Sequence, residues 1–234
     1  KEIDASFYRF NLGLCCIIGA LGVIGFIGLE SNFISKFFIW LWLGLILIIT
    51  SYYWNNKNKN NFILSLVSVV GCFAFYQIII QISPKSDSLF LFFITFLGSL
   101  ITGSVFFSMI LGHWYLNVIN LPIKLLKRSI LVFSLLIIIR TLWDFVFMSL
   151  ENVVDPYGIS YSLWAFTLEF EGFLLVIAIF MGNIAPLILN LFIWKTLKLQ
   201  ATQSATGLIY VSVISILFGD LLFKYYLLKF GFLL

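Results

Sequence analysis

The sequence predicts an all-α membrane protein: a bundle of about seven transmembrane helices with a cytoplasmic N-terminus and an extracytoplasmic C-terminus. The 234-residue chain is 62% hydrophobic and only 10% charged, which is too little polar surface for a water-soluble domain. Its apolar residues gather into runs of roughly 20, the length that a helix needs to cross a bilayer. These runs lack the alternation of barrel strands, so helices are the remaining way to satisfy the backbone in lipid.

Seven apolar runs, separated by segments rich in Asn, Ser, Pro and Lys, define the expected membrane helices. They cover residues 11–29, 37–54, 62–82, 89–116, 129–150, 172–194 and 205–228, within one helical domain over residues 1–234. No cleavage site of small residues follows the first run, so we interpret it as a retained anchor.

The loop charges predict the orientation, because Lys and Arg accumulate on the cytoplasmic side of membrane proteins. With the N-terminus inside, nine of these residues fall on the cytoplasmic side and four on the other. The nine are Lys1, Arg9, Lys57, Lys59, Lys124, Lys127, Arg128, Lys195 and Lys198, and the four are Lys36, Lys85, Lys224 and Lys229. We therefore expect a multi-pass membrane protein whose N-terminus is cytoplasmic and whose C-terminus is extracytoplasmic.

Small residues and tryptophans in the spans have packing explanations. Glycines recur every third residue in the first span, at Gly19, Gly22, Gly25 and Gly28, a spacing that lets a neighbouring helix come close. The fourth span carries a similar group, made of Gly98, Ser99, Thr102, Gly103 and Ser104. An aromatic belt at the membrane interfaces is expected to include Trp40, Trp42, Trp54, Trp114, Trp164 and Trp194.

Ionisable residues at membrane depth are the strongest functional candidates, because placing each charge there costs roughly 2.5 to 3.5 kcal/mol. Arg140 and Asp144 are four residues apart in the fifth span and share one helical face. Asp220 and Lys224 repeat this spacing in the seventh span, with Asp220 at the depth of Asp144 and Lys224 about one turn further out. We predict one charge-neutral network of these four residues. The structural alternative is two separate ion pairs, with Lys224 reaching to the interface.

Further polar residues extend this network towards the outer side. Glu169, Asn183 and Asn190 align at helical spacing along the sixth span, where Pro186 predicts a kink. Gln77 and Gln81 give the third span an outer polar face.

A second polar cluster is predicted on the cytoplasmic side. His113, Trp114 and Tyr115 end the fourth span, and Gln203 and Ser204 open the seventh, so these five residues are candidates for a ligand site. The alternatives are an aromatic belt around His113 and helix capping by Thr202 or Ser204. With a single histidine, and with Cys15, Cys16 and Cys72 in no metal-site spacing, this chain alone is expected to hold no haem or metal.

Two stretches carry a resemblance to a protein family. LGHWYLN at 111–117 and TQSATGLIYV at 202–211 resemble the signature stretches of a group of uncharacterised bacterial polytopic integral membrane proteins. Trp143 and the Trp194-Lys195-Thr196 stretch are similarly placed. The resemblance covers roughly the C-terminal half. It implies a bacterial-type inner-membrane topology, and hence a bacterial or organellar inner membrane, and it draws attention to His113, Gln203 and Ser204.

Three hypotheses of function follow. The first is an integral membrane subunit of a larger redox or energy-converting complex, with a quinone or lipid as ligand and with the bilayer and other membrane subunits, but no nucleic acid, as partners. The second is a small transporter or an ion- or proton-conducting protein that uses the charge network. The third is a retinal-binding protein with Lys224 as the Schiff-base lysine, although Lys224 lies near a span end. No catalytic motif decides whether the chain is an enzyme.

Overall fold

The computed structural model of the chain describes residues 5–28, 32–55, 60–82, 88–118, 122–154 and 158–234. The predicted turn at 83–87 lies outside these ranges, and so do parts of those at 30–32, 55–61 and 155–158. The chain divides into two compact units, Lys1–Phe92 and Phe93–Leu234, which are taken separately below. One domain over residues 1–234 therefore stays a prediction.

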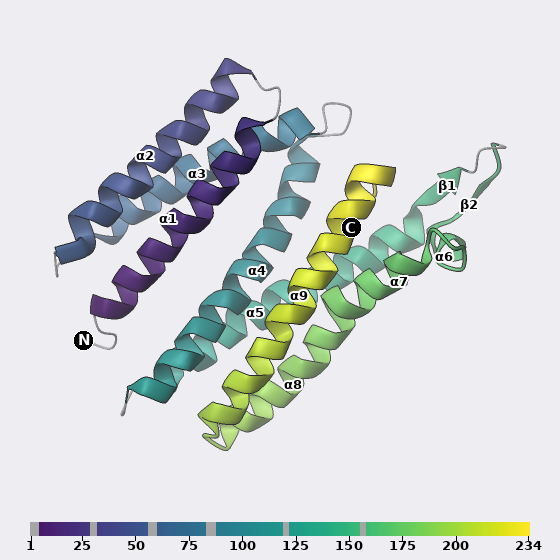
Figure 1. The fold of residues 1–234 in the computed structure, drawn as a ribbon. Helices are drawn as coiled ribbons and strands as arrows, with labels where there is room; N and C mark the ends of the chain where they lie inside the picture. The colour runs from purple at the N-terminus through teal and green to yellow at the C-terminus, as the bar shows by residue number, and fades with distance from the viewer. Residues whose placement is uncertain (1–4, 29–31, 56–59, 83–87, 119–121, 155–157) are drawn as a thin grey trace. The chain divides into compact units, whose positions relative to one another are not determined.

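The prediction of an all-α bundle with seven membrane-spanning helices is confirmed for the described residues, in which seven helices are long and apolar enough to cross a membrane. Five of the spans are the single helices α1 (Ala5–Ile27), α2 (Phe33–Asn55), α3 (Asn61–Ile82), α4 (Ser88–Asn117) and α5 (Lys124–Leu150). The sixth joins α7 (Phe173–Ile179), the π-helical turn η1 (Phe180–Ile184) and α8 (Ala185–Lys198), and the seventh is α9 (Thr202–Phe230). Figure 1 labels each of these helices and colours them by their position along the chain.

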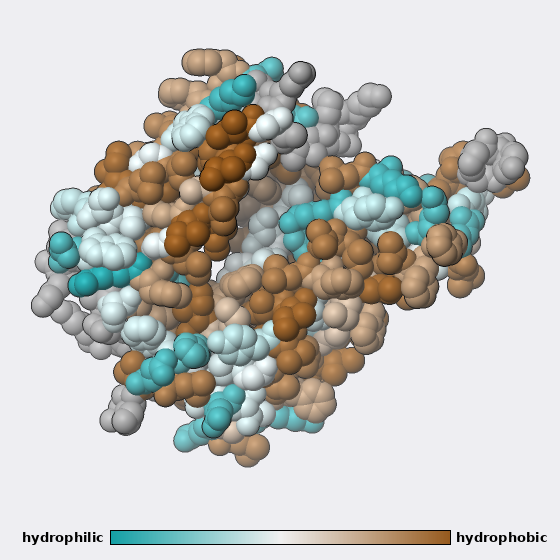
Figure 2. All heavy atoms as spheres, viewed as in Figure 1, coloured by the Kyte–Doolittle hydropathy of each residue, from teal (hydrophilic) through white to brown (hydrophobic). Residues whose placement is uncertain are grey.

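The exposed surface of these helices is apolar, as a lipid-facing surface has to be. Hydrophobic residues, drawn brown, cover much of the face seen in Figure 2. Large apolar side chains such as Phe33, Phe62 and Leu142 are more than half exposed. The chain is therefore a multi-pass membrane protein whose helices contact the lipid bilayer.

In the first unit, α1, α2 and α3 pack together around a core of Val23, Phe26, Ile39, Leu43 and Ala74. Trp42 of α2 fills the space beside two glycines: a methyl group at Gly19 would lie 2.9 Å from its ring, and one at Gly71 would lie 2.5 Å from Nε1. Trp42 was expected in the interfacial belt. It lies instead in the middle of α2. Its indole fits between closely packed helices there because the two neighbouring residues are glycines, which have no side chain.

The other three glycines of the predicted small-residue groove are not covered in the same way. Nothing among the described residues lies within 4 Å of a methyl group placed at Gly22, Gly25 or Gly28. Among the described residues, a neighbouring helix therefore fills this groove only at Gly19.

In the second unit, α9 packs along α7, η1 and α8, and α5 packs on α8. One end of this unit carries a hairpin of β1 (Asn152–Val154) and β2 (Ser160–Ser162), in which Val153 pairs with Tyr161, followed by the short helix α6 (Leu163–Phe166). The sequence predicted only a turn here. Two strands of three residues are too short to give a clear alternating pattern, so the hairpin was missed.

An aromatic cluster closes the same end of the second unit. It consists of Phe166, Tyr226, Phe230 and Phe232, whose ring centroids lie 5.3 to 6.3 Å apart. The Tyr226 hydroxyl donates a hydrogen bond to the Glu171 carbonyl oxygen. Gly231, at φ +77°, ends α9 in the left-handed conformation that glycine adopts without strain. The segment that follows α9 is thereby turned back onto the helices.

The predicted orientation can be tested with topology reporters, since it depends on nine basic loop residues against four. We expect a reporter fused after Leu234 to be active only outside the cytoplasm. A reporter in the loop between α2 and α3 should be active only inside. A cytoplasmic position for residue 234 would contradict the N-in, C-out topology.

Candidate functional site

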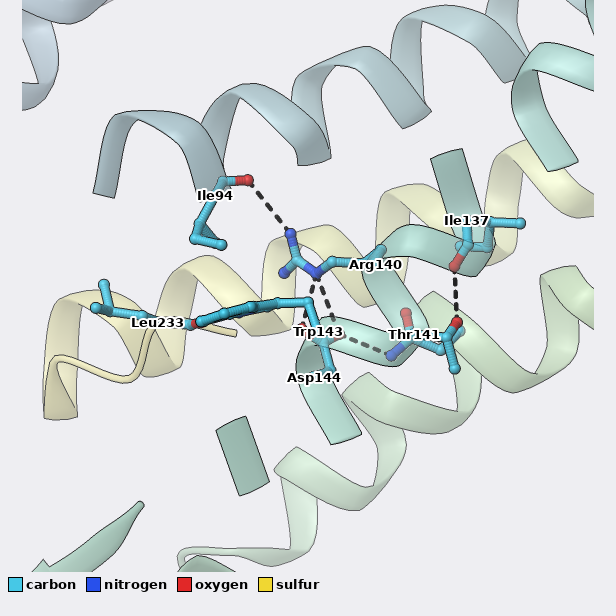
Figure 3. A network of polar contacts seen from close by, with 8 residues as sticks. Ile94, Ile137, Arg140, Thr141, Trp143, Asp144 and Leu233 are labelled. Atoms are coloured by element: carbon cyan, nitrogen blue, oxygen red, sulfur yellow. Dashed lines mark hydrogen bonds and ion pairs between the residues drawn. The ribbon is translucent and has the colours of Figure 1, made fainter. Parts of the chain in front are cut away.

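The site centres on Arg140 and Asp144, one helical turn apart on α5. Both side chains are buried, and Arg140 Nε lies 3.0 Å from Asp144 Oδ1 and 3.1 Å from Oδ2, to which it donates a hydrogen bond. Arg140 Nη1 is also 3.5 Å from the backbone carbonyl oxygen of Ile94 on α4. Figure 3 shows the guanidinium lying between that carbonyl group and the Asp144 carboxylate. The i, i+4 spacing thus produces the buried ion pair.

Asn183 brings the sixth span into the same site. Its Nδ2 donates a hydrogen bond of 2.8 Å to Asp144 Oδ2, and its side chain is buried. Asn183 belongs to the π-helical turn η1, a distortion that is frequent at functional sites. The carboxylate therefore accepts hydrogen bonds from two helices.

Pro186 gives the π-helical turn a physical cause. Proline has no N–H to donate to the preceding turn, and in the i to i+5 pattern the acceptor left without a donor is the Met181 carbonyl oxygen. Ser215 on α9 supplies the missing donor, through a hydrogen bond of 2.6 Å from its Oγ to that oxygen. The predicted kink at Pro186 is thus a turn of wider helix supported by a neighbouring helix.

Two glycines let η1 and α9 come into close contact. A methyl group added at Gly219 would overlap the backbone of Gly182, and one added at Gly182 would lie 2.5 Å from the Phe223 ring. The same ring stacks on the site, since Arg140 Cζ lies 4.7 Å from its centroid, within the range of a cation–π contact. Close helix packing therefore brings Phe223 against the guanidinium.

Asp220 and Lys224 form the second ion pair, on α9, with 2.5 Å between Lys224 Nζ and Asp220 Oδ2. Gly98 on α4 shows that the two pairs are neighbours. A methyl group at Gly98 would lie 3.0 Å from Asp220 Oδ1 and 3.4 Å from Arg140 Nη1. Asp220 thus pairs with Lys224, and its free oxygen faces the same small space as Arg140.

A small cavity lies between the two pairs. It is lined by Gly98, Ile101, Arg140, Gly182, Asn183, Ile216, Asp220 and Phe223. The centre of a water molecule can occupy about 20 Å³ of it, which is enough for about one water. Asp144 reaches this cavity through Arg140 and Asn183, which both line it.

The other outer polar residues lie apart from this cavity. Glu169 does not continue the helical face of Asn183, because it lies in the turn between α6 and α7. It is exposed and accepts a hydrogen bond of 3.1 Å from the Tyr161 hydroxyl. Gln77 and Gln81 belong to the first unit, where Gln81 Nε2 donates to Ser35 Oγ at 3.3 Å.

Asn190 forms a separate polar group with residues that the sequence did not single out. The Ser134 hydroxyl on α5 accepts hydrogen bonds from Asn190 Nδ2 at 2.7 Å and from Trp194 Nε1 at 3.1 Å. Ser134 gave no sequence signal, because isolated serines are common in membrane helices. Only the register between α5 and α8 reveals its role.

The predicted cytoplasmic cluster is exposed rather than enclosed. His113, Gln203 and Ser204 all have exposed side chains, while Trp114 and Tyr115 are half-buried. The Tyr115 hydroxyl donates to the Pro122 carbonyl oxygen. The ends of α4 and α9 meet instead at Gly112 and Thr206, where a methyl group on the glycine would lie 2.8 Å from the threonine hydroxyl.

The predicted helix cap at the start of α9 is wrong. The capping position is occupied by Ala201, and neither Thr202 nor Ser204 supplies a side-chain cap. Thr202 is already the first residue of α9, so it cannot occupy the capping position before the helix. Its carbonyl oxygen accepts a hydrogen bond from the Thr206 hydroxyl.

Neither a metal-binding group nor a similar known protein identifies the function of this site. Within the described ranges, no group of three or more His, Cys, Asp or Glu residues could hold a metal ion. No family model, curated protein or solved structure matches the chain. The family resemblance of residues 111–117 and 202–211 stays an expectation. The buried charges are the feature of the site that bears on function.

Proposed function

We propose that the chain is a small transporter or an ion- or proton-conducting membrane protein, with Arg140, Asp144, Asp220 and Lys224 as its working site. The observation that carries the proposal is the cavity between two ion pairs inside a membrane-spanning unit. Ionisable residues are rare at such depth, and they characteristically line ion pathways and proton relays.

The exposure of the four charges supports a route from the surface inward. The exposed fraction falls from 48% for Lys224 and 18% for Asp220 to 5% for Arg140 and 3% for Asp144. If the charges served stability alone, one buried ion pair or one surface ion pair would be enough. A gradient of exposure across two neighbouring pairs would not be required. The arrangement instead places one partly exposed carboxylate next to one buried carboxylate.

Arg140 lies where it can serve both carboxylates. It is paired with Asp144 and faces Asp220 across the space beside Gly98. The four charges sum to zero, so a proton on either carboxylate leaves one positive charge in excess. The guanidinium is then drawn to the carboxylate that is still charged, since attraction between charges is strong at low dielectric. A proton arriving at one aspartate thereby changes the pairing of the other.

Flux measurements in liposomes test the proposal. Wild-type protein should move protons or a small ion down an imposed gradient faster than protein-free liposomes, as followed with an entrapped pH dye and with ion-sensitive dyes. Asp220→Asn should lower that flux about tenfold or more, because it removes a group that can carry a proton. Glu169→Gln is the matched control, since it removes an exposed carboxylate outside the cavity.

Two results would contradict the proposal: no flux above protein-free liposomes for any tested ion, or equal flux in wild type and Asp220→Asn. The redox-complex hypothesis leaves a different trace. A subunit of such a complex would co-purify in mild detergent with partner polypeptides that show haem or iron–sulfur absorbance, whereas a free-standing transporter would be isolated colourless.

A further inference from the structure

The face that α5 shares with α8 carries a second buried polar group, well away from the charges. Ser134 accepts from Asn190 and Trp194, and its own hydroxyl donates to the Ile130 carbonyl oxygen at 2.6 Å. The serine hydroxyl is therefore fully used. Asn190 is 5% exposed, and its Oδ1 is buried without a hydrogen-bond partner among the described residues.

Asn183 repeats this pattern seven residues earlier in the same span. Its Nδ2 is used by Asp144 on α5, and its Oδ1 is likewise buried without a partner among the described residues. A buried amide oxygen without a donor is costly, and nothing in lipid can supply one. Two such oxygens, both from asparagines bonded to α5, indicate that each accepts from a small donor such as water.

We propose that α5 and the sixth span, through η1 and α8, enclose a proton path, with Asp144 and Asn183 as its first polar station and Ser134 and Asn190 as its second. This inference rests on the proposed function and names its ion. On α5 the two stations are ten residues apart, roughly 15 Å along the helix. Buried apolar residues lie between them, Ile137 on α5 and Pro186 on α8. Ile137 is the closure of this path.

The chemistry of the stations selects protons over metal cations. Among the described residues, each station offers one unpartnered amide oxygen, Asn183 Oδ1 or Asn190 Oδ1, and only the first also has a carboxylate, which is too few oxygen ligands for a metal cation. A proton needs only a short file of water. It binds the Asp144 carboxylate to give the neutral acid, passes to water beside Asn190, and leaves the carboxylate regenerated. The electrochemical proton gradient drives the transfer, and no other reactant is consumed.

Opening the closure tests the inference. Ile137→Ala should raise the proton flux into dye-loaded liposomes several-fold, because it makes room for water between the stations. Ile138→Ala is the matched control, since the same truncation on the next residue of α5 lies at a 44% exposed, lipid-facing position. Adding Asn190→Leu to Ile137→Ala should return the flux to the wild-type level. Elution as a single helical species checks folding, and Ile137→Val replaces Ile137→Ala if the alanine variant fails that check.

The outcomes separate this inference from the proposed function. Equal proton flux in folded Ile137 and Ile138 variants would overturn the path. Movement of sodium, potassium or chloride that depends on Asp220, with proton flux at background throughout, would overturn the path while leaving the proposed function in place. The absence of any Asp220-dependent movement would overturn both.

Discussion

Arg140→Leu is expected to destabilise the protein by about 3 to 5 kcal/mol, the cost of breaking a buried ion pair by removing one partner. The substitution leaves the Asp144 carboxylate buried, with Asn183 as its remaining hydrogen-bond donor. The measurement is the midpoint of thermal unfolding in detergent. Arg128→Leu is the matched control, because this exposed arginine lies on the same helix and its loss should leave the midpoint nearly unchanged.

The double variant Arg140→Leu with Asp144→Leu should recover much of the lost stability, because it removes both charges and leaves no unpaired ion. A flux measurement on the double variant then distinguishes a role of the pair in stability from a role in transport. A stable double variant without flux would mean that the charges work in transport. If Arg140→Leu unfolds at the same temperature as the wild type, the ion pair does not stabilise the protein, and its burial is contradicted.

Gly219→Ala should disrupt the second unit more than an ordinary overpacked core residue, for which the loss is about 1 to 3 kcal/mol. The added methyl group would overlap the backbone of Gly182, and a backbone cannot move aside as a flexible side chain can. Separation of η1 from α9 would also strain the hydrogen bond from Ser215 to Met181. We expect a large drop in folded, monodisperse protein after detergent extraction.

Gly207→Ala is the control for this prediction, because a methyl group at Gly207, on the same helix, has nothing within 4 Å. In a helix interior this change is favourable by roughly 0.8 to 1 kcal/mol, so the control should be neutral or slightly stabilising. Equal yields of the two alanine variants would show that η1 and α9 are not in contact at Gly219.

The sequence predicted those features of the site that depend on spacing within one helix. Arg140 and Asp144 pair because four residues make one helical turn, and Asp220 and Lys224 pair for the same reason. The seven spans followed from the length of the apolar runs. Such local rules need no knowledge of how the helices pack.

Contacts between helices could not be predicted in this way. The bond from Asn183 to Asp144 depends on the register between two spans, and a π-helical turn lies in one of them. The bond from Trp143 Nε1 to the Leu233 carbonyl oxygen joins residues 90 positions apart. It requires the turn back at Gly231, which a list of spans does not contain. The neighbouring positions of Asp220 and Arg140 depend on the glycine at position 98 of a third helix.

The support of the π-helical turn by α9 has a mechanical consequence. The π-helical turn interrupts the regular α-helical hydrogen bonds between α7 and α8. Ser215 bonds to the Met181 carbonyl oxygen inside this turn, and Gly219 packs against Gly182 one residue further on. If α8 moved about the turn, it would have to break that bond or carry α9 with it. The contacts therefore couple any movement of α8 to the helix that bears Asp220.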